Sequence, residues 1–189
     1  MSDAKVVYDA CLLYPAPLRS FLMYLAMTGL YRARWTNEIH EEWMRNVQSD
    51  HPNMTRMKVE RIRDLMNAHV LECEVSGYEF LIPTLTLPDP DDRHILAAAI
   101  HCGANFIVTF NLKDFPEHIL EPFGIEAQHP DQFVLRHLVN TPDVVCGAAR
   151  RHRESLKSPP MTAEKYLATL ERQGLERTVS NLRDCAELI

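Results

Sequence analysis

Residues 87–116 read LPDPDDRHILAAAIHCGANFIVTFNLKDFP, and this stretch decides the fold. The proline-rich turn at 88–90 leads into a helix so apolar that it must be buried on most sides, and Gly103 ends it. The β-branched run 106–109 that follows predicts a strand. A buried helix directly before a buried strand is typical of an α/β protein with a parallel sheet.

Toward the N-terminus, residues 5–8 (KVVY) form a short β-favouring run that ends at Asp9, and we expect a buried first strand there. The elements expected between this strand and the central stretch are a helix over about 15–29, a helix from Thr36 or Asn37 to about 47, a helix over about 54–68, a strand over 70–75 and an irregular connection over 77–87.

After Pro130 the pattern becomes helical only, with helices expected over about 131–139, 142–157 and 162–186 and a break at residues 158–160 (SPP). We therefore divide the chain into an α/β domain, residues 1–130, and an all-helical C-terminal extension, residues 131–189. The extension is either an added lobe or a packing and partner-binding element, and the pattern does not separate these two readings.

Composition sets the broad class of protein. The chain has 189 residues, of which 46% are hydrophobic and 24% charged, as in a folded domain with a sizeable core. Its five cysteines are scattered singly, which favours neither a disulfide framework nor a thiolate metal site and fits a reducing compartment. No secretory signal or membrane-spanning stretch is recognisable, so we expect a soluble cytoplasmic protein.

The net charge of −6 disfavours a nucleic-acid partner at first sight, because such partners are bound mainly through phosphate neutralisation. A metal site built from carboxylates changes this argument, since its own cations cancel the negative charge. An acidic protein can therefore still hold a nucleic acid locally.

Acidic side chains follow two of the predicted strands, at Asp9 and at Asp114. Ligands collect outside the carboxyl ends of parallel strands, which places these acids at one edge of the sheet. Clustered carboxylates repel one another unless a cation such as Mg²⁺ or Mn²⁺ compensates them. Taken singly, each acid also has an ordinary explanation as a turn or helix-cap residue.

Three segments, in this order and spacing, resemble the PIN-domain family and within it the VapC-like toxins of type II toxin–antitoxin modules. They are KVVYDACLLYPAPLR (5–19), RWTNEIHEEW (34–43) and the central stretch (87–116). The resemblance covers about residues 4–130, and the helical tail resembles the extension of some longer members. It implies a ribonuclease with a Mg²⁺ or Mn²⁺ site formed by Asp9, Glu42, Asp92 and Asp114.

The fourth metal ligand stays open in this comparison. Many relatives carry an acid where this chain has Asn111, so the ligand is either Asp114 or the amide oxygen of Asn111 with Asp114 in support. Asp91 is an outer-shell candidate, and the Thr109 hydroxyl either orients a ligand or serves packing alone. Two basic residues near these acids, Arg93 and Lys113, either contact phosphate or pair with neighbouring acids.

The resemblance implies a metal-dependent endoribonuclease that acts as the toxin of a toxin–antitoxin module, with RNA as substrate, a cognate antitoxin as partner and a homodimer as a further possibility. The alternative is a catalytically weak or inactive PIN-fold module that binds nucleic acid or protein. Other classes lack support. A calcium loop would need glycine at His94 and glutamate at Ile100, an aspartyl phosphatase would need a second aspartate at Cys11, and no P-loop or paired-histidine zinc motif is present.

Overall fold

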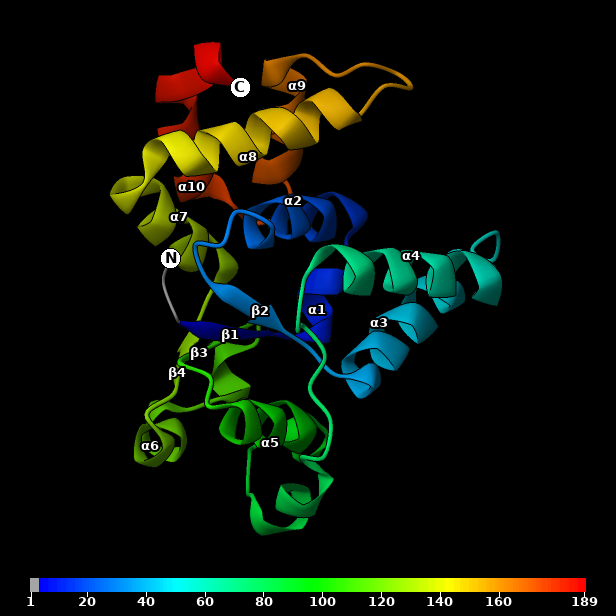
Figure 1. Cartoon of the computed structure of the whole chain (residues 1–189), viewed down its shortest axis with the longest axis vertical. Helices are drawn as coiled ribbons and strands as arrows, with labels where there is room; N and C mark the ends of the chain where they lie inside the picture. The colour runs from blue at the N-terminus through cyan, green and yellow to red at the C-terminus, as the bar shows by residue number, and fades with distance from the viewer. Residues whose placement is uncertain (1–3) are drawn as a thin grey trace.

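The computed structural model describes residues 4–189, except for the side chains of residues 186–188 (Figure 1). Four parallel strands form one sheet in the order β2-β1-β3-β4, and their bounds are β1 Lys5–Tyr8, β2 Arg32–Arg34, β3 Phe106–Val108 and β4 Glu126–Gln128. Val7 of β1 pairs with Arg34 on one side and with Ile107 on the other. The carboxyl ends of the strands are therefore level and meet at one edge of the sheet, where the sequence places its acids.

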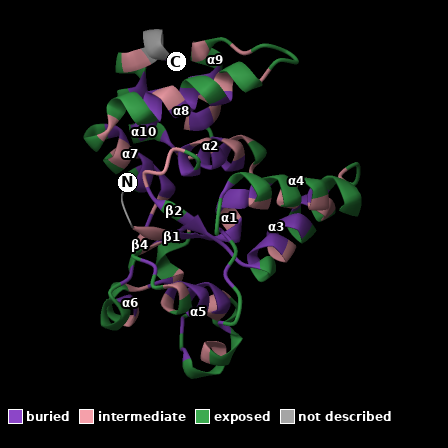
Figure 2. Cartoon of the chain, viewed as in Figure 1, coloured by how far each residue is buried: buried purple, intermediate pink, exposed green. Residues whose placement is uncertain are grey.

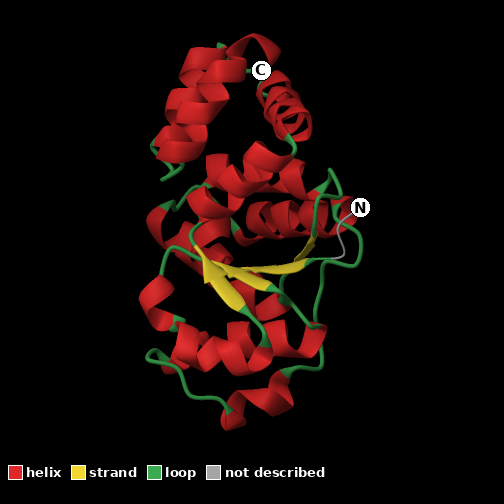
Figure 3. Ribbon diagram, turned by 90° about the vertical axis from the view of Figure 1, so that its left-hand side faces the viewer, coloured by secondary structure: helices red, strands yellow, loops and turns green. Residues whose placement is uncertain are grey.

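Helices cover both faces of the sheet, as Figure 3 shows, which confirms the predicted α/β class. Helices α5 (Arg93–Cys102) and α6 (Glu117–Leu120) lie on one face, below the sheet in Figure 1. The opposite face is covered by α2 (Ala16–Ala26) and α7 (Pro130–Asn140), and α8 (Pro142–Ser155) packs against these two helices from outside.

The remaining helices complete these layers. α3 (Asn37–Asp50) packs against α4 (Arg56–His69) and against the short α1 (Ala10–Leu13), beyond the carboxyl end of β1. The last helices are α9 (Ala163–Glu171) and α10 (Glu176–Leu182). Five short 3-10 helices span Glu79–Thr84, Pro90–Asp92, Leu112–Asp114, Glu121–Phe123 and Arg183–Leu188.

The core lies between the sheet and these helices (Figure 2). Val6, Val7 and Tyr8 of β1 are completely buried, and so is the apolar run of α5 from Ile95 to Ala99. Gly103 ends α5 in the left-handed conformation, with φ at 65°, a backbone region that glycine enters without steric cost. The central stretch of sequence thus forms the helix, stop and strand that its pattern predicts.

The C-terminal helices form a packed layer on α2 and do not stand apart as a separate lobe. Val145, Ala148 and Ala149 of α8 are completely buried, and the rings of Phe21 and Tyr24 of α2 stack on His152 of α8. Among the described residues, no helix is long and apolar enough to span a membrane.

Two sequence predictions are wrong, each for a local reason. Residues 70–75 are not a strand: Glu72 takes a positive φ of 55°, and only one bridge, between Trp35 and Glu74, extends the sheet there. The helix expected over 162–186 is divided, because Gly174 turns the chain with φ at 83° between α9 and α10. Residues 1–3 of the predicted α/β domain and the side chain of residue 186 lie outside the described residues.

Candidate metal centre

Asp9 is fixed at the carboxyl end of β1 by hydrogen bonds from three directions. It is the N-cap of α1, and its Oδ1 accepts the backbone N–H of Cys11 at 3.2 Å. Its Oδ2 accepts the Thr109 hydroxyl at 2.6 Å and the Cys11 thiol at 3.1 Å. With only 4% of its surface exposed, Asp9 is a buried carboxylate whose orientation the two neighbouring strands determine.

Thr109, the residue directly after β3, links Asp9 to the next loop. Its hydroxyl donates to Asp9 and accepts the backbone N–H of Asn111 at 2.9 Å. The side chain is completely buried. The Thr109 hydroxyl therefore has a polar partner on each side, in addition to its packing role.

Asp92 lies at the end of the 3-10 turn that leads into α5, directly before the first residue of that helix. Burial raises the pKa of its carboxyl to about 7, and the charges of four other acids add to this effect. In order of decreasing effect these acids are Asp9, Asp89, Asp114 and Glu42. Carboxylates from three other segments and one from its own turn thus act on Asp92, which indicates that acidic side chains converge at this edge of the sheet.

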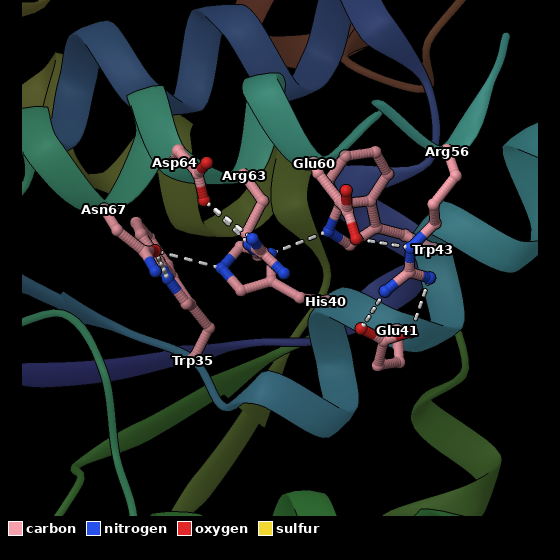
Figure 4. A network of polar contacts seen from close by, with 9 residues as sticks. All are labelled: Trp35, His40, Glu41, Trp43, Arg56, Glu60, Arg63, Asp64 and Asn67. Atoms are coloured by element: carbon pink, nitrogen blue, oxygen red, sulfur yellow. Dashed lines mark hydrogen bonds and ion pairs between the residues drawn. The ribbon is translucent and has the colours of Figure 1, made fainter. Parts of the chain in front are cut away.

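Glu42 projects from α3, and a polar network holds this helix in place (Figure 4). The Asn67 Oδ1 of α4 accepts the indole N–H of Trp35 at 2.8 Å and lies 3.0 Å from the His40 Nε2. The His40 Nδ1 accepts the indole N–H of Trp43 at 2.9 Å. Because indole nitrogens only donate, the proton of a neutral His40 must sit on Nε2.

An ion pair between Glu41 and Arg56 connects α3 to α4. Arg56 donates to both carboxylate oxygens of Glu41 at 2.7 Å and to Glu60 at 2.7 Å, and Arg63 pairs with Asp64 at 2.8 Å (Figure 4). Arg56 and Arg63 of α4 are therefore engaged with neighbouring acids.

A cavity of about 430 Å³ opens where α3 faces the start of α5. Its lining residues are Glu38, Glu41, Glu42, Arg45, Asp89, Asp91, Asp92, His94 and Asn111. Asp9 and Asp114 lie outside this lining, Asp9 directly after β1 and Asp114 in the adjoining 3-10 turn, and the charges of both act on Asp92. The structure thus brings Glu42, Asp92 and Asn111 to one cavity.

Five lining residues had no assigned role in the sequence analysis: Glu38, Glu41, Arg45, Asp89 and His94. Arg45 follows Glu42 by three positions, and His94 follows Asp91 by three, so helical spacing places each on the same face as an acid. This helical spacing is the feature of the sequence from which Arg45 and His94 could have been identified as site residues. Arg93, in contrast, donates its Nε to the carbonyl oxygen of Pro90 at 2.7 Å.

The donor chemistry fits a hard divalent cation, since carboxylate and amide oxygens are the ligands that Mg²⁺ and Mn²⁺ take. Among the described residues, no three His, Cys, Asp or Glu side chains lie at the spacing of direct coordination. A cation held here would therefore keep several water ligands, as Mg²⁺ commonly does.

The fold and these acids define an α/β protein with a carboxylate-lined cavity at the carboxyl edge of its sheet. The model of the PIN domain family matches residues 1–113, and the model of the VapC50 C-terminal domain matches residues 130–184. The chain belongs to the PIN domain family.

One relative comes from Mycobacterium tuberculosis (strain ATCC 25618 / H37Rv) and bears the name "Putative ribonuclease VapC50". It is 39% identical over 97 residues, which cover 51% of this chain and 57% of the relative. The match therefore spans little more than half of that protein's length. No solved structure matches the chain.

Proposed function

We propose that the protein is a metal-dependent endoribonuclease and the toxin of a toxin–antitoxin module. The observation that carries this proposal is the cavity at the carboxyl edge of the sheet, where Glu42, Asp92 and Asn111 offer oxygen ligands together. The raised pKa of Asp92 supports it, because burial and neighbouring carboxylates concentrate negative charge that a cation would relieve. The name of the relative and the two family models support a nuclease of the VapC kind.

Each side chain has a distinct task in this proposal. Asp9, Glu42 and Asp92 would hold Mg²⁺ or Mn²⁺, with Asp114 or the amide oxygen of Asn111 as the fourth ligand. The bound cation would supply an activated water and stabilise the leaving oxygen of the phosphodiester. Thr109 would fix the orientation of the Asp9 carboxylate, and the guanidinium of Arg45 on the cavity wall would orient an RNA phosphate.

Cleavage of RNA by the purified protein tests this proposal. We expect cleavage with Mg²⁺ or Mn²⁺, none with EDTA, and a loss of at least a hundredfold in Asp9→Asn and Asp92→Asn. Asp143→Asn, at an exposed position of α8, is the matched control and should cleave like the wild type. Undiminished cleavage by either site variant would refute the assignment of the site.

A catalytically weak or inactive binding module is the second candidate. Asn111 favours it, because an amide replaces an acid at that position, and so does the absence of three directly coordinating side chains among the described residues. Clean metal binding without cleavage across a broad RNA panel would support this alternative.

The partners belong to the same proposal. We propose that a cognate antitoxin covers the cavity, that the protein forms a homodimer, and that it acts on RNA in the cytoplasm. Size-exclusion chromatography with light scattering measures the assembly: a single species of one chain mass at micromolar concentration would contradict the dimer.

A further inference from the structure

His94 is a buried polar residue that the proposed mechanism does not use. It is the second residue of α5, its side chain is only 7% exposed, and it lines the acidic cavity. The Nδ1 atom is buried without a hydrogen-bond partner. A buried nitrogen without a hydrogen bond costs free energy, so the groups that face the two ring nitrogens decide what this side chain can bind.

The two ring nitrogens of His94 face two different glutamates of α3. Nδ1 lies 3.8 Å from the Glu38 Oε2, and Nε2 lies 3.7 Å from the Glu42 Oε2. Tyr78 donates its hydroxyl to the same Oε2 of Glu38 at 3.2 Å, which fixes the position of that carboxylate. Tyr78, Glu38, His94 and Glu42 thus form a row that ends in the cavity.

A neutral imidazole carries one N–H and one lone pair. If the N–H is on Nδ1, toward the anchored Glu38, the lone pair of Nε2 faces the carboxylate of Glu42. Two electron pairs in this position repel unless a second ring proton or a metal ion lies between them, and the experiment below distinguishes these two. A histidine that donates one N–H to a carboxylate and offers its other nitrogen to a metal is a recurrent arrangement in metalloproteins.

The separation of 3.7 Å suits one ion shared by Nε2 and the Glu42 oxygen, because two bonds of about 2.1 Å can span up to about 4.2 Å. We propose that His94 and Glu42 form a mixed nitrogen–oxygen site, and that the protein therefore prefers a first-row transition ion such as Mn²⁺ over Mg²⁺. This inference rests on the proposed function, since Glu42 belongs to the same centre. Water or phosphate oxygens complete the coordination.

Pulsed electron paramagnetic resonance of the full chain loaded with Mn²⁺ alone tests the inference directly, because a bound nitrogen couples to the electron spin. We expect a ¹⁴N coupling in the wild type and in His101→Gln, a matched control on the exposed end of the same helix. His94→Gln should lose the coupling. Calorimetry should show Mn²⁺ binding weakened about tenfold in His94→Gln and Mg²⁺ binding changed less than twofold.

A wild-type Mn²⁺ spectrum without nitrogen coupling overturns the inference, and this result does not depend on whether the variant folds. Equal weakening of Mg²⁺ and Mn²⁺ in His94→Gln also overturns it, since that pattern means only a positioning role. RNA cleavage separates the two proposals. Cleavage that requires Asp9 but occurs without nitrogen coupling leaves the proposed function intact, whereas a failure to bind Mn²⁺ at all overturns both.

Discussion

At the scale of single residues, the Thr109 hydroxyl links the loop after β3 to Asp9 at the end of β1, next to the candidate metal centre. Replacing Thr109 with valine keeps the shape but removes the donor to Asp9 and the acceptor of the Asn111 N–H. We expect Thr109→Val to lose about 1–3 kcal/mol of unfolding free energy and at least tenfold in RNA cleavage. Chemical denaturation and initial cleavage rates measure the two effects.

Thr109→Ser is the control for this prediction, because it keeps the hydroxyl and removes only a methyl group. Serine should retain cleavage within about threefold of the wild type. If valine cleaves as well as serine, Thr109 has a packing role only and does not position Asp9.

The pKa of His137 predicts how stability depends on pH. Burial, followed by the charge of Arg136, lowers this pKa from 6.5 to about 4, and the ring packs against Tyr31 and Phe133. Between these values the unfolded chain binds a proton that the folded chain does not, so the contribution of His137 is complete above pH 6.5 and is lost as the pH falls toward 4. Near pH 5 the loss approaches about 1.4 kcal/mol per pH unit.

His137→Phe should therefore reduce the dependence of unfolding free energy on pH by close to one proton between pH 6.5 and 4.5. Asp92 contributes to the pH dependence of the unfolding free energy with the opposite sign, because its raised pKa makes the folded state bind the extra proton. This effect is present in both proteins and cancels in the comparison. Equal slopes for wild type and variant, from urea denaturation at several pH values, would refute the prediction.

At the scale of elements, a buried carboxylate attaches α10 to α7. Asp131 is 5% exposed, and its two oxygens accept the backbone N–H groups of Arg177 and Thr178, in the first turn of α10, at 3.0 and 2.8 Å. Asp131→Ala leaves both groups without this partner. We expect a loss of about 2 kcal/mol, or about 4–8 °C in Tm.

The control is Asp143→Ala, which removes an exposed acid from the first turn of α8. It should cost less than about 1 kcal/mol, because only its interaction with the helix dipole is lost. Calorimetry on both variants measures the difference. Equal losses of unfolding free energy in the two variants would show that the Asp131 hydrogen bonds contribute no more to stability than an ordinary charge at a helix end.

The elements that could be predicted from sequence are those with a strong local signal. The apolar run of α5, its stop at Gly103 and the β-branched β3 have one, and so has the N-cap hydroxyl of Thr36 on α3. β2 and β4 do not: they are three-residue edge strands, RAR and EAQ, whose sequences alone do not favour a strand. Pairing with β1 and β3 makes them strands, and that partnership is not local.

The same distinction applies to the candidate site. Asp9 follows a predicted strand, so its place at the carboxyl edge of the sheet could be predicted from position, whereas Asp92 was assigned to the site by the family resemblance alone. In the structure Asp9 directly follows β1, and its charge acts on Asp92. The contacts of His94 with Glu38 and Glu42 depend on how α3 approaches α5. That approach is set by packing between distant segments, which no local pattern reveals.

At the scale of the whole molecule, the C-terminal helices supply part of the core on which the α/β part depends. His152 of α8 stacks on the rings of Phe21 and Tyr24 of α2, with ring centres 6.3 and 5.2 Å away, and its Nδ1 lies 3.0 Å from the Tyr166 hydroxyl of α9. Without α8 this face of α2 would meet water. Burial of apolar area is the main favourable term in folding, so its loss affects the entire domain.

We therefore expect a fragment of residues 1–129 to lose cooperative unfolding or to aggregate, although it contains every proposed metal ligand. Circular dichroism during heating, with the full chain as reference, measures this. If the C-terminal helices were an independent lobe, the opposite result would be expected: their removal would leave the Tm of the α/β part within a few degrees of that of the full chain. A fragment that unfolds cooperatively at that temperature would show that the α2–α8 contact is dispensable, and that the C-terminal helices serve a partner and not the core.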